Sequence, residues 1–254
     1  LRPAIYGTVI KIYKFYPLNL YYGYYYRGKP RIARGIWHLL DIWNLHAYNE
    51  IKGILSREKP DVVHSNSLRG LSFSALSAIR SLKCKHIHTL HDYGLLSPWV
   101  TLMRRGKIMS EFNLFDRGYM RISRYFTDKV QVVLSPSQFV LDLHRKNGFF
   151  PNAAWVKLPY GIVIRNSEEK KDYETLKILY VGQLYKHKGV NMLIRAFKAL
   201  KHEQVSLHIV GGGPQLETLR SLSRGDRRIK FYGPVPQNQL NRFYKEAAVT
   251  IVPS

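Results

Sequence analysis

The sequence predicts an α/β fold in which helices pack on the faces of parallel sheets. Short apolar runs that read as strands alternate with helical patterns, and a glycine or a proline follows most of these runs. Such alternation is typical of parallel sheets. The single cysteine argues against a disulfide scaffold. A chain of 254 residues is long enough for two domains with separate cores.

The first half of the chain should begin with a long helix that leads into a strand over 60–65. Apolar residues at helical spacing predict that one face of this helix is buried. They are Ile36, Leu39, Leu40, Trp43, Ala47, Ile51 and Ile54. A second helix should follow, with Leu71, Ala75, Ile79 and Leu82 aligned on one face. Another strand is then expected over 86–93.

The second half alternates more regularly. Strands are expected over 178–181, 205–210, 228–232 and 249–252, with a helix between each strand and the next. The helices carry apolar residues at the spacing of a half-buried helix. The expected buried faces are Val190, Leu193, Ile194, Phe197 and Leu200 in the first, Leu216, Leu219 and Leu222 in the second, and Leu240, Phe243, Tyr244 and Ala247 in the third.

The turn after the strand over 178–181 suggests a phosphate site. Gly182 ends this strand, and a basic loop leads to a helix start, where free backbone N–H groups and the helix dipole favour an anion. Gln183 and Lys188 add a hydrogen-bond donor and a mobile positive charge. The alternative is an ordinary turn, because most strand–loop–helix turns in α/β domains bind nothing.

Five short motifs occur in order in this half: Gly182-Gln183, Lys188-Gly189, Gly211-Gly212-Gly213-Pro214, Gly233-Pro234-Val235 and Val252-Pro253-Ser254. Together they resemble the donor domain of the retaining group-1 glycosyltransferases (GT4-like), whose GT-B fold has two Rossmann-like domains facing across a cleft. The resemblance implies that Lys188 holds the diphosphate of a nucleotide-sugar and that the backbone near Val235 meets the nucleobase. Gly182, Gln183 and Gly213 complete the implied donor-binding set.

The first half resembles the acceptor domain of the same family. The motifs are Pro60-Asp-Val-Val-His64 and Thr89-Leu-His-Asp-Tyr93. In the family, a histidine at the end of this second strand faces the cleft beside the donor sugar, and His91 matches it, which implies a catalytic role. An imidazole there can donate a hydrogen bond or carry partial charge near an oxocarbenium-like centre. Gly161 resembles the crossing between the domains.

The resemblance divides the chain into an acceptor-side domain over 1–160, which lacks its first strand, and a partial donor domain over 173–254, with a polar linker over 165–175. It implies transfer of a hexosyl group from a nucleotide-sugar to a hydroxyl of a glycan or lipid-linked acceptor, with retention of configuration. The expected setting is the synthesis of cell-envelope polysaccharide or glycolipid. No cofactor and no metal are expected.

Two departures from the family pattern affect this expectation. Gln183 replaces the family's arginine, and the lost charge-assisted hydrogen bonds would cost about 1–3 kcal/mol of donor affinity. The family's paired glutamates would lie beyond Ser254. We therefore expect an internal fragment of a longer chain that is itself inactive. A natural truncated paralogue is the alternative.

Three histidines close in sequence, His86, His88 and His91, raise the alternative of a metal site. His86 and His88 share one face of a strand, whereas His91 lies on the other face unless the strand has already ended. A zinc site would also need a fourth ligand or an open position with an organised second shell. No downstream residues have ligand spacing, so we do not expect a metal.

The net charge of +23 adds a further indication. The first 40 residues hold seven Lys or Arg and no acidic residue, together with a tyrosine cluster at Tyr21, Tyr22, Tyr24, Tyr25 and Tyr26. Such a segment can bind single-stranded nucleic acid, lie on an anionic membrane surface, or be a solvated basic surface. Nucleic acid is the least favoured of the three.

The alternative function is a non-catalytic basic α/β module that binds anionic polymer or a membrane surface. No apolar run has the length of a membrane span, and no signal peptide is visible. The expected location is the cytoplasm, peripheral on the inner membrane face if the basic segment binds lipid.

Overall fold

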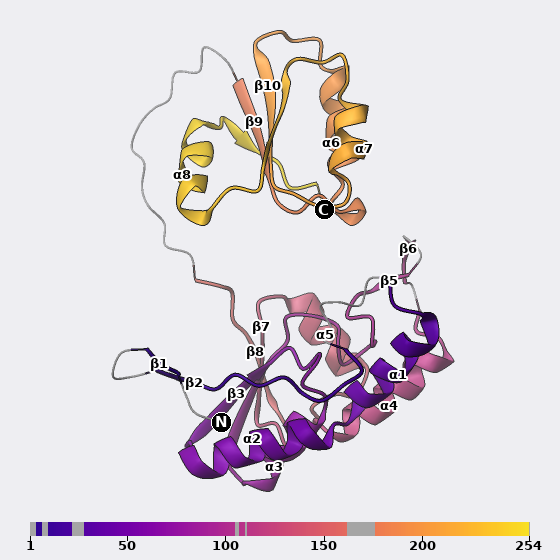
Figure 1. Ribbon diagram of the computed structural model, residues 1–254, viewed down its shortest axis with the longest axis vertical. Coiled ribbons are helices and arrows are strands. Elements are labelled where there is room, and N and C mark those ends of the chain that lie inside the picture. Colours follow the sequence, from indigo (N-terminus) through magenta and orange to yellow (C-terminus); the bar gives the residue numbers. More distant parts are fainter. Residues whose placement is uncertain are drawn as a thin grey trace. The chain divides into compact units, whose positions relative to one another are not determined.

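The computed structural model describes residues 4–6, 10–21, 28–104, 107–109, 111–161 and 176–253. The chain divides into two compact units, Leu1–Ile162 and Val163–Ser254, called here the N-terminal and the C-terminal unit (Figure 1). The expected linker over 165–175 and four tyrosines of the cluster (Tyr22, Tyr24, Tyr25 and Tyr26) lie outside the described residues.

The N-terminal unit is built on a parallel sheet with the strand order β3-β4-β7-β8. These strands are β3 (Val62–Asn66), β4 (Lys85–Thr89), β7 (Val132–Ser135) and β8 (Ala154–Lys157). The connecting helices are α3 (Ser74–Ser81), α4 (Leu114–Tyr125) and α5 (Gln138–Lys146). The strands follow one another in chain order, so right-handed crossovers place these helices on one face of the sheet. Side chains from all three helices accordingly share one hydrophobic cluster with Val133 of β7.

Strand β4 ends four residues earlier than the sequence predicts, at Thr89 rather than 93. His91 therefore lies in the loop after the strand. Two antiparallel hairpins complete the unit: β1 (Ala4–Tyr6) with β2 (Ile10–Ile12), and β5 (Met103–Arg104) with β6 (Lys107–Ile108).

The prediction of one long first helix is wrong. Two helices occur, α1 (Arg31–Ile42) and α2 (Leu45–Glu58). The break lies at Asn44, whose side-chain oxygen accepts a hydrogen bond of 3.0 Å from the Ala47 N–H and so caps α2. Of the predicted buried face, Ala47 is buried and Ile51 packs against the core. The part on and just after α1 is exposed: Ile36, Leu39, Leu40 and Trp43.

The C-terminal unit contains a second parallel sheet, with the order β11-β10-β9-β12. The strands are β9 (Leu176–Val181), β10 (Val205–Val210), β11 (Ile229–Gly233) and β12 (Val249–Thr250). Helices α6 (Val190–Ala199) and α7 (Leu216–Leu222) cover one face, and α8 (Gln237–Glu246) covers the other (Figure 1). The order reverses at β9, which pairs with both β10 and β12. In open α/β sheets such a reversal marks the preferred ligand site.

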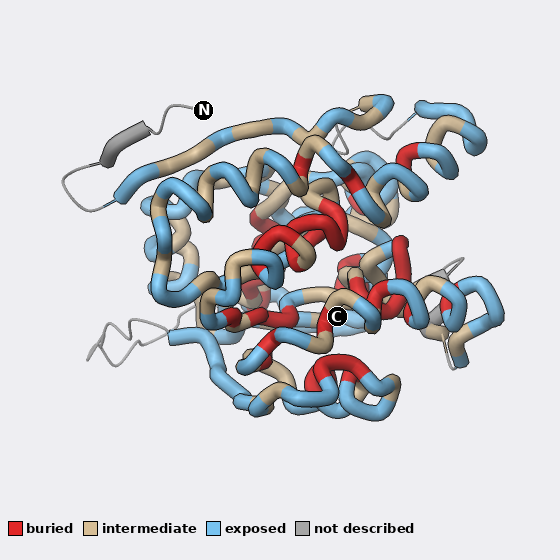
Figure 2. The backbone as a smooth tube through the Cα atoms, turned by 90° about the horizontal axis from the view of Figure 1, so that it is seen from below, coloured by how far each residue is buried: buried red, intermediate tan, exposed pale blue. Residues whose placement is uncertain are grey.

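These two sheets confirm the predicted α/β class. Burial along the backbone is marked in red in Figure 2. Four of the five residues predicted to be buried on α6 are buried, namely Val190, Leu193, Ile194 and Phe197. Leu200 is not, because it caps the helix in an extended conformation and stays 47% exposed. Tyr244 on α8 is also exposed, since α8 buries none of its residues completely.

The glycine run after β10 is required by a close backbone contact. Gly211 has φ +137°, and a Cβ placed there would lie 1.9 Å from the carbonyl oxygen of Gly182. At Gly213 a Cβ would lie 2.7 Å from the carbonyl oxygen of Leu184. The same loops are joined by hydrogen bonds from Gly182 N–H to the Val210 oxygen (3.0 Å) and from Leu184 N–H to the Gly212 oxygen (2.9 Å). No side chain fits between them.

We predict that Gly211→Ala lowers the free energy of unfolding of the C-terminal unit by about 2–4 kcal/mol, through backbone strain and overlap with Gly182. All four tryptophans lie in the N-terminal unit, at Trp37, Trp43, Trp99 and Trp155. The variant should therefore shift the urea transition seen by circular dichroism and leave the tryptophan fluorescence transition unchanged.

The matched control is Gly53→Ala on α2, where an added Cβ meets no atom within 4 Å. It should be neutral or stabilising, because alanine favours a helix by about 0.5–1 kcal/mol over glycine. Equal unfolding curves for Gly211→Ala and the wild type would contradict the close-contact account.

Candidate functional site

In the N-terminal unit, the carboxyl ends of three strands bring Asn66, His91 and Tyr160 together. His91 Nε2 lies 2.9 Å from the Asn66 side-chain oxygen, an acceptor, so the imidazole carries its proton on Nε2. Nδ1 is then an acceptor for the Tyr160 hydroxyl. The two rings stack with centroids 5.7 Å apart and planes 10° apart. These partners set the tautomer and the orientation of an otherwise exposed imidazole.

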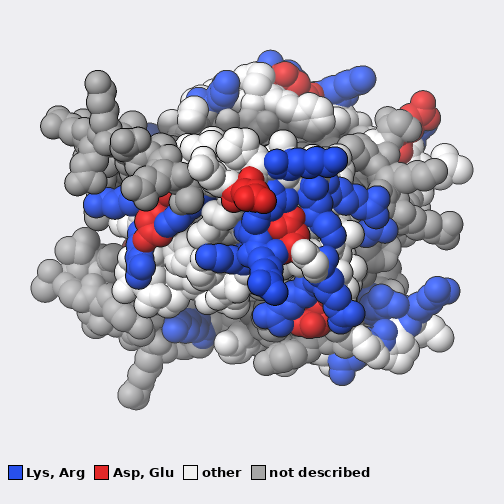
Figure 3. Space-filling model, turned by 90° about the horizontal axis from the view of Figure 1, so that it is seen from above, with Lys and Arg blue, Asp and Glu red and all other residues white. Residues whose placement is uncertain are grey.

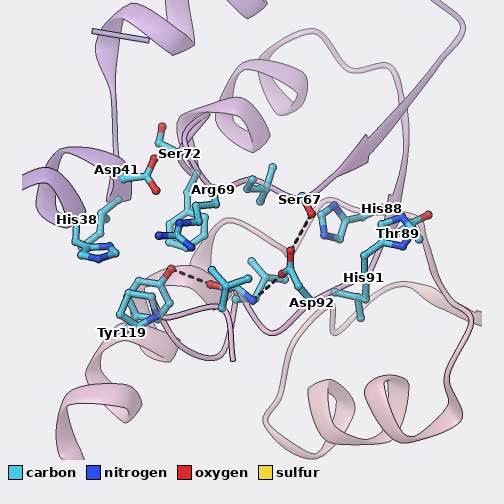
Figure 4. Close-up of a pocket in the computed structure, with 18 residues that line it drawn as sticks. His38, Asp41, Ser67, Arg69, Ser72, His88, Thr89, His91, Asp92 and Tyr119 are labelled. Carbon is cyan, nitrogen blue, oxygen red and sulfur yellow. Dashed lines mark hydrogen bonds between the residues drawn. The ribbon is translucent and has the colours of Figure 1, made fainter. Parts of the chain in front are cut away.

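Asp92, the next residue, is held as firmly. Its carboxylate accepts hydrogen bonds of 2.8 Å from the Ser67 hydroxyl and 2.8 Å from the Gly94 N–H. A pocket in this unit opens among the loops after β3 and β4 and reaches α1 and α4. Figure 4 shows Ser67, Asp92 and His91 at one end of it.

At the other end of the pocket lie Asp41, Arg69 and His38 (Figure 4). The Asp41 carboxylate accepts hydrogen bonds of 2.9 and 3.2 Å from the Gly70 N–H. Burial nevertheless raises the pKa of Asp41 to about 7. Burial, followed by the charge of Arg69, lowers the pKa of His38. The Tyr119 hydroxyl lies beside them and donates to the Gly94 oxygen at 2.8 Å.

The pocket therefore offers carboxylates, imidazoles and a guanidinium within one hollow. The cavity that they line is small, about 30 Å³, so the set can hydrogen-bond one polar group of a ligand and does not enclose a sugar. Sequence reasoning missed Asp41, Arg69, Ser67 and Asn66. Asp41 had one usable signal, since it is the first acidic residue of the chain and lies three positions after His38 on a helix.

The other two histidines of the predicted cluster have a different hydrogen-bond partner, although His88 lines the same pocket as His91. His86 Nε2 and His88 Nδ1 each lie 2.7 Å from the hydroxyl oxygen of Ser65 on the neighbouring strand, apart from the partners of His91. Within the part of the chain that the structure describes, no three His, Cys, Asp or Glu side chains are grouped to hold a metal ion.

Burial, with smaller contributions from neighbouring histidines, lowers the pKa of His86 to about 4 and that of His88 to about 3. Burial also lowers the pKa of His144, on α5, to about 4. All three imidazoles are therefore neutral in the folded unit near pH 7, and protonating them in place is unfavourable.

In the C-terminal unit, Gly182 and Gln183 follow β9, and Gly213 packs against the next residue, Leu184. The Gly211 N–H donates to the Gly233 oxygen at 2.8 Å, which links these turns to the strand before Val235. The loop after β9 continues into a short 3₁₀ helix, η2 (Lys186–Lys188). Gly189 then adopts φ +68° and starts α6.

The four motif segments that begin at Gly182, Lys188, Gly211 and Gly233 thus meet at the carboxyl edge of this sheet. The fifth segment contacts them through Pro253. A Cβ on Gly189 would lie 2.9 Å from the carbonyl oxygen of Pro253, and one on Gly212 would lie 2.9 Å from Pro234. The side chain of Gln183 is exposed. The backbone carbonyl of this residue accepts a hydrogen bond of 2.9 Å from the Tyr180 hydroxyl. All five predicted donor residues lie at this edge of the C-terminal sheet, while His91 belongs to the N-terminal unit.

Comparison with known families agrees with this geometry. Residues 13–164 match the model of Glycosyltransferase Family 4, and residues 164–254 match that of the glycosyl transferases group 1. The first match alone covers more than half of the chain, which therefore belongs to Glycosyltransferase Family 4. The predicted resemblance to group-1 glycosyltransferases is confirmed, and so are the two Rossmann-like α/β units of the GT-B fold class; retention of configuration stays a prediction.

Curated relatives match over part of their length. The chain is 30% identical over 132 residues to an "uncharacterized 42.6 kDa protein in cps region" of Klebsiella pneumoniae, covering 52% of this chain and 35% of that protein. It is 32% identical over 174 residues to an "uncharacterized glycosyltransferase" of Methanocaldococcus jannaschii, covering 63% and 40%. The chain thus spans well under half the length of these relatives.

Solved structures share the fold. The Anabaena protein HepE, crystallised with UDP, matches with a TM-score of 0.61 and 16% identity, covering 82% of this chain and 56% of that one. A glycosyltransferase from Rickettsia africae matches with a TM-score of 0.59 and 17% identity, covering 83% and 55%.

We predict that acid destabilises the N-terminal unit before its carboxylates are fully protonated. The unfolded chain binds protons at its histidines below about pH 6.5, whereas folded His86, His88 and His144 resist them until about pH 3–4. Stability is therefore lost as the pH falls from about 6.5, by up to about 1.4 kcal/mol per histidine and pH unit. Burial raises the pKa of Asp41 to about 7, so this group binds a proton more readily in the folded unit and gains stability as the pH falls. This single group opposes the three histidines.

The measurement is the urea midpoint of tryptophan fluorescence at pH 7.5, 5.5 and 4.5. The variant His88→Asn, which keeps an amide near the Nδ1 position but cannot titrate, should lose less stability across this range. His46→Asn on α2, a half-exposed position, is the control and should behave as the wild type does. A midpoint that is flat down to pH 4.5 would contradict the assignment.

Proposed function

We propose that this protein acts as a glycosyltransferase that moves a hexosyl group from a nucleotide-sugar to a hydroxyl of a glycan or lipid-linked acceptor. The observation that carries the proposal is the meeting of five family motifs at the carboxyl edge of the C-terminal sheet, next to the strand-order reversal at β9. The Anabaena relative in structure is described in complex with UDP and with UDP-glucose, which supports a nucleotide-sugar donor. The Klebsiella relative's name places it in a cps region, which supports a role in envelope polysaccharide synthesis.

The C-terminal unit is the proposed donor domain. The start of α6 faces this edge, where its first N–H groups and its dipole favour the diphosphate. Lys188, half-buried one residue before Gly189, adds a cation close to the same point. Gln183 contributes a neutral donor, and Gly213 lets the loop after β10 pack directly on the backbone of Leu184 beside it. The backbone near Val235 would meet the nucleobase.

The N-terminal unit is the proposed acceptor domain. Its pocket carries side chains that match a hydroxyl-rich acceptor, with Asp92 and Ser67 fixed beside His91. His91 is the proposed catalytic residue. Its Nε2 proton would stabilise charge at the donor sugar after the sugar replaces the Asn66 side-chain oxygen as the hydrogen-bond acceptor. We propose retention of configuration and a reaction without metal or cofactor, on the family resemblance alone.

A second candidate is the non-catalytic basic module, and one observation favours it. Figure 3 shows Lys and Arg side chains crowded on one face with few acidic residues among them. A hollow in the C-terminal unit is lined by Lys198, Lys201, Arg224 and Arg228, with Glu203 and Asp226 beside them. If this were the main function, polyanions would bind more tightly than nucleotides and with a steep salt dependence.

We predict that the chain binds UDP or GDP and that Lys188→Ala weakens this binding about tenfold or more, because a charge-assisted contact to the diphosphate is lost. Isothermal calorimetry at fixed ionic strength measures it. Lys201→Ala is the matched control, since it removes the same charge at the amino end of β10 and should leave the affinity unchanged. Equal affinity in wild type and Lys188→Ala would contradict the proposal that Lys188 binds the diphosphate. Absence of nucleotide binding would argue for the basic module.

We also predict that Gln183→Arg tightens nucleoside diphosphate binding by about tenfold, because a guanidinium can grip two phosphate oxygens at once. The control Gln183→Lys adds the same charge without the planar fork. It should give a smaller gain in the same titration. Unchanged affinity in Gln183→Arg would show that this side chain points away from the phosphates.

A further inference from the structure

One end of the pocket in the N-terminal unit gathers cationic side chains. Arg34, His38 and Asp41 follow the i, i+4, i+7 spacing of one face of α1. Arg69, from the loop after β3, lies at the same end of the pocket as His38 and Asp41 (Figure 4). Among the residues that the structure describes, neither Arg34 nor Arg69 forms an ion pair.

Arg34 gives the stronger indication of a ligand. The residue is half-buried, and its Nε atom is buried with no hydrogen-bond partner in the described part of the chain. Nearly all buried donors in proteins have an acceptor, so this one needs an explanation. Burial, followed by the charges of Arg69 and Arg34, lowers the pKa of His38, so the positive potential of both guanidiniums reaches that imidazole. A bound anion would supply an acceptor and compensate this charge.

The two carboxylates that line the pocket are bonded by neutral groups instead. Asp92 accepts hydrogen bonds from the Ser67 hydroxyl and the Gly94 N–H, each at 2.8 Å. Asp41 accepts from the Gly70 N–H at 2.9 and 3.2 Å. Burial raises the pKa of Asp41 to about 7, and an anion bound nearby would raise it further. Asp41 would then take up a proton and would not repel the anion.

Aromatic rings position this end of the pocket. Trp37 is buried, and its indole donates to the Tyr21 carbonyl at 2.8 Å. The guanidinium carbon of Arg69 lies 5.9 Å from the centroid of the Trp37 ring. The His38 ring makes edge-on contacts with Trp37 and with Trp99, each at a centroid distance of 5.1 Å. Cations that are held in this way lose less conformational entropy when they bind a ligand.

We propose that Arg34, His38 and Arg69 bind a negatively charged group of the acceptor, either a phosphate or a carboxylate. The planar fork of a guanidinium donates to two oxygens of such a group at once. The cavity of about 30 Å³ has room for about two or three water-sized atoms, which suits one anionic group. Because His91 lines the same pocket, we assign the anion to the acceptor. This assignment rests on the proposed transferase function, whereas the anion site itself does not.

Tryptophan fluorescence of the 254-residue chain tests the anion site, because Trp37 and Trp99 contact its side chains. We expect inorganic phosphate or glucuronate, titrated at fixed ionic strength and pH, to change the emission. Glucose has the sugar ring of glucuronate without the charge and should leave the emission unchanged. Tighter binding of phosphate would assign a phosphorylated acceptor, and tighter binding of glucuronate would assign an acidic sugar.

The double variant Arg34→Gln with Arg69→Gln should weaken anion binding about tenfold or more, because charge-assisted contacts are lost. The matched control is Arg31→Gln with Arg121→Gln, at exposed positions on α1 and α4. It makes the same change of charge in the same unit and should bind as the wild type does. Arg69→Gln alone, at an exposed position, should weaken binding about threefold or more, and it tests the site even if the double variant does not fold.

Unchanged urea transitions would show that the variants are folded. The anion site is contradicted if neither anion changes the emission of the wild type, if glucose binds as well as glucuronate, or if both double variants weaken binding equally. Lys188→Ala, in the C-terminal unit, should leave this titration unchanged.

Calorimetry with UDP separates the anion site from the transferase function. Anion binding without UDP binding would keep the site and reject the transferase function. UDP binding without binding of phosphate or glucuronate to the N-terminal unit would keep the transferase proposal and reject the site.

Discussion

Parallel strand pairing is the constraint on which both units depend. It brings the carboxyl ends of successive strands to one edge of the sheet. Residues that are far apart in the sequence therefore meet at this edge. In the C-terminal unit, β9 and β10 pair in register from Leu176 with Val205 to Val181 with Val210. The loops that follow these strands run so close that Gly211 and Gly213 have no space for a side chain.

In the N-terminal unit the same constraint gathers polar side chains rather than glycines. Asn66 ends β3, His91 follows β4 and Tyr160 follows β8, and hydrogen bonds join the imidazole to both of the others. Below this edge, the sheet buries His86 and His88 around Ser65. Both imidazoles are neutral near pH 7, and protonating them inside the folded unit is unfavourable. We therefore expect acid to lower the stability of the same sheet that orients His91.

Helix α1 shows how one element can serve two surfaces. One side lines the pocket with His38 and Asp41, and another exposes Ile32, Ile36 and Leu39 to solvent. Apolar periodicity identifies this apolar face but cannot say which side of a helix meets the core. The Asn44 cap separates α1 from α2; Ala47 after this break is buried, while Leu39 before it is exposed.

The sequence by itself determined the α/β class and the strands and helices of the second half, because apolar periodicity is a local property. The family motifs also placed the five donor residues and His91 in the chain. Only the tertiary structure decided that His91 binds Asn66 and Tyr160 and that Asp41 lies half-buried against Gly70. These contacts join segments that lie from 25 to 69 residues apart, and no local pattern records such pairings.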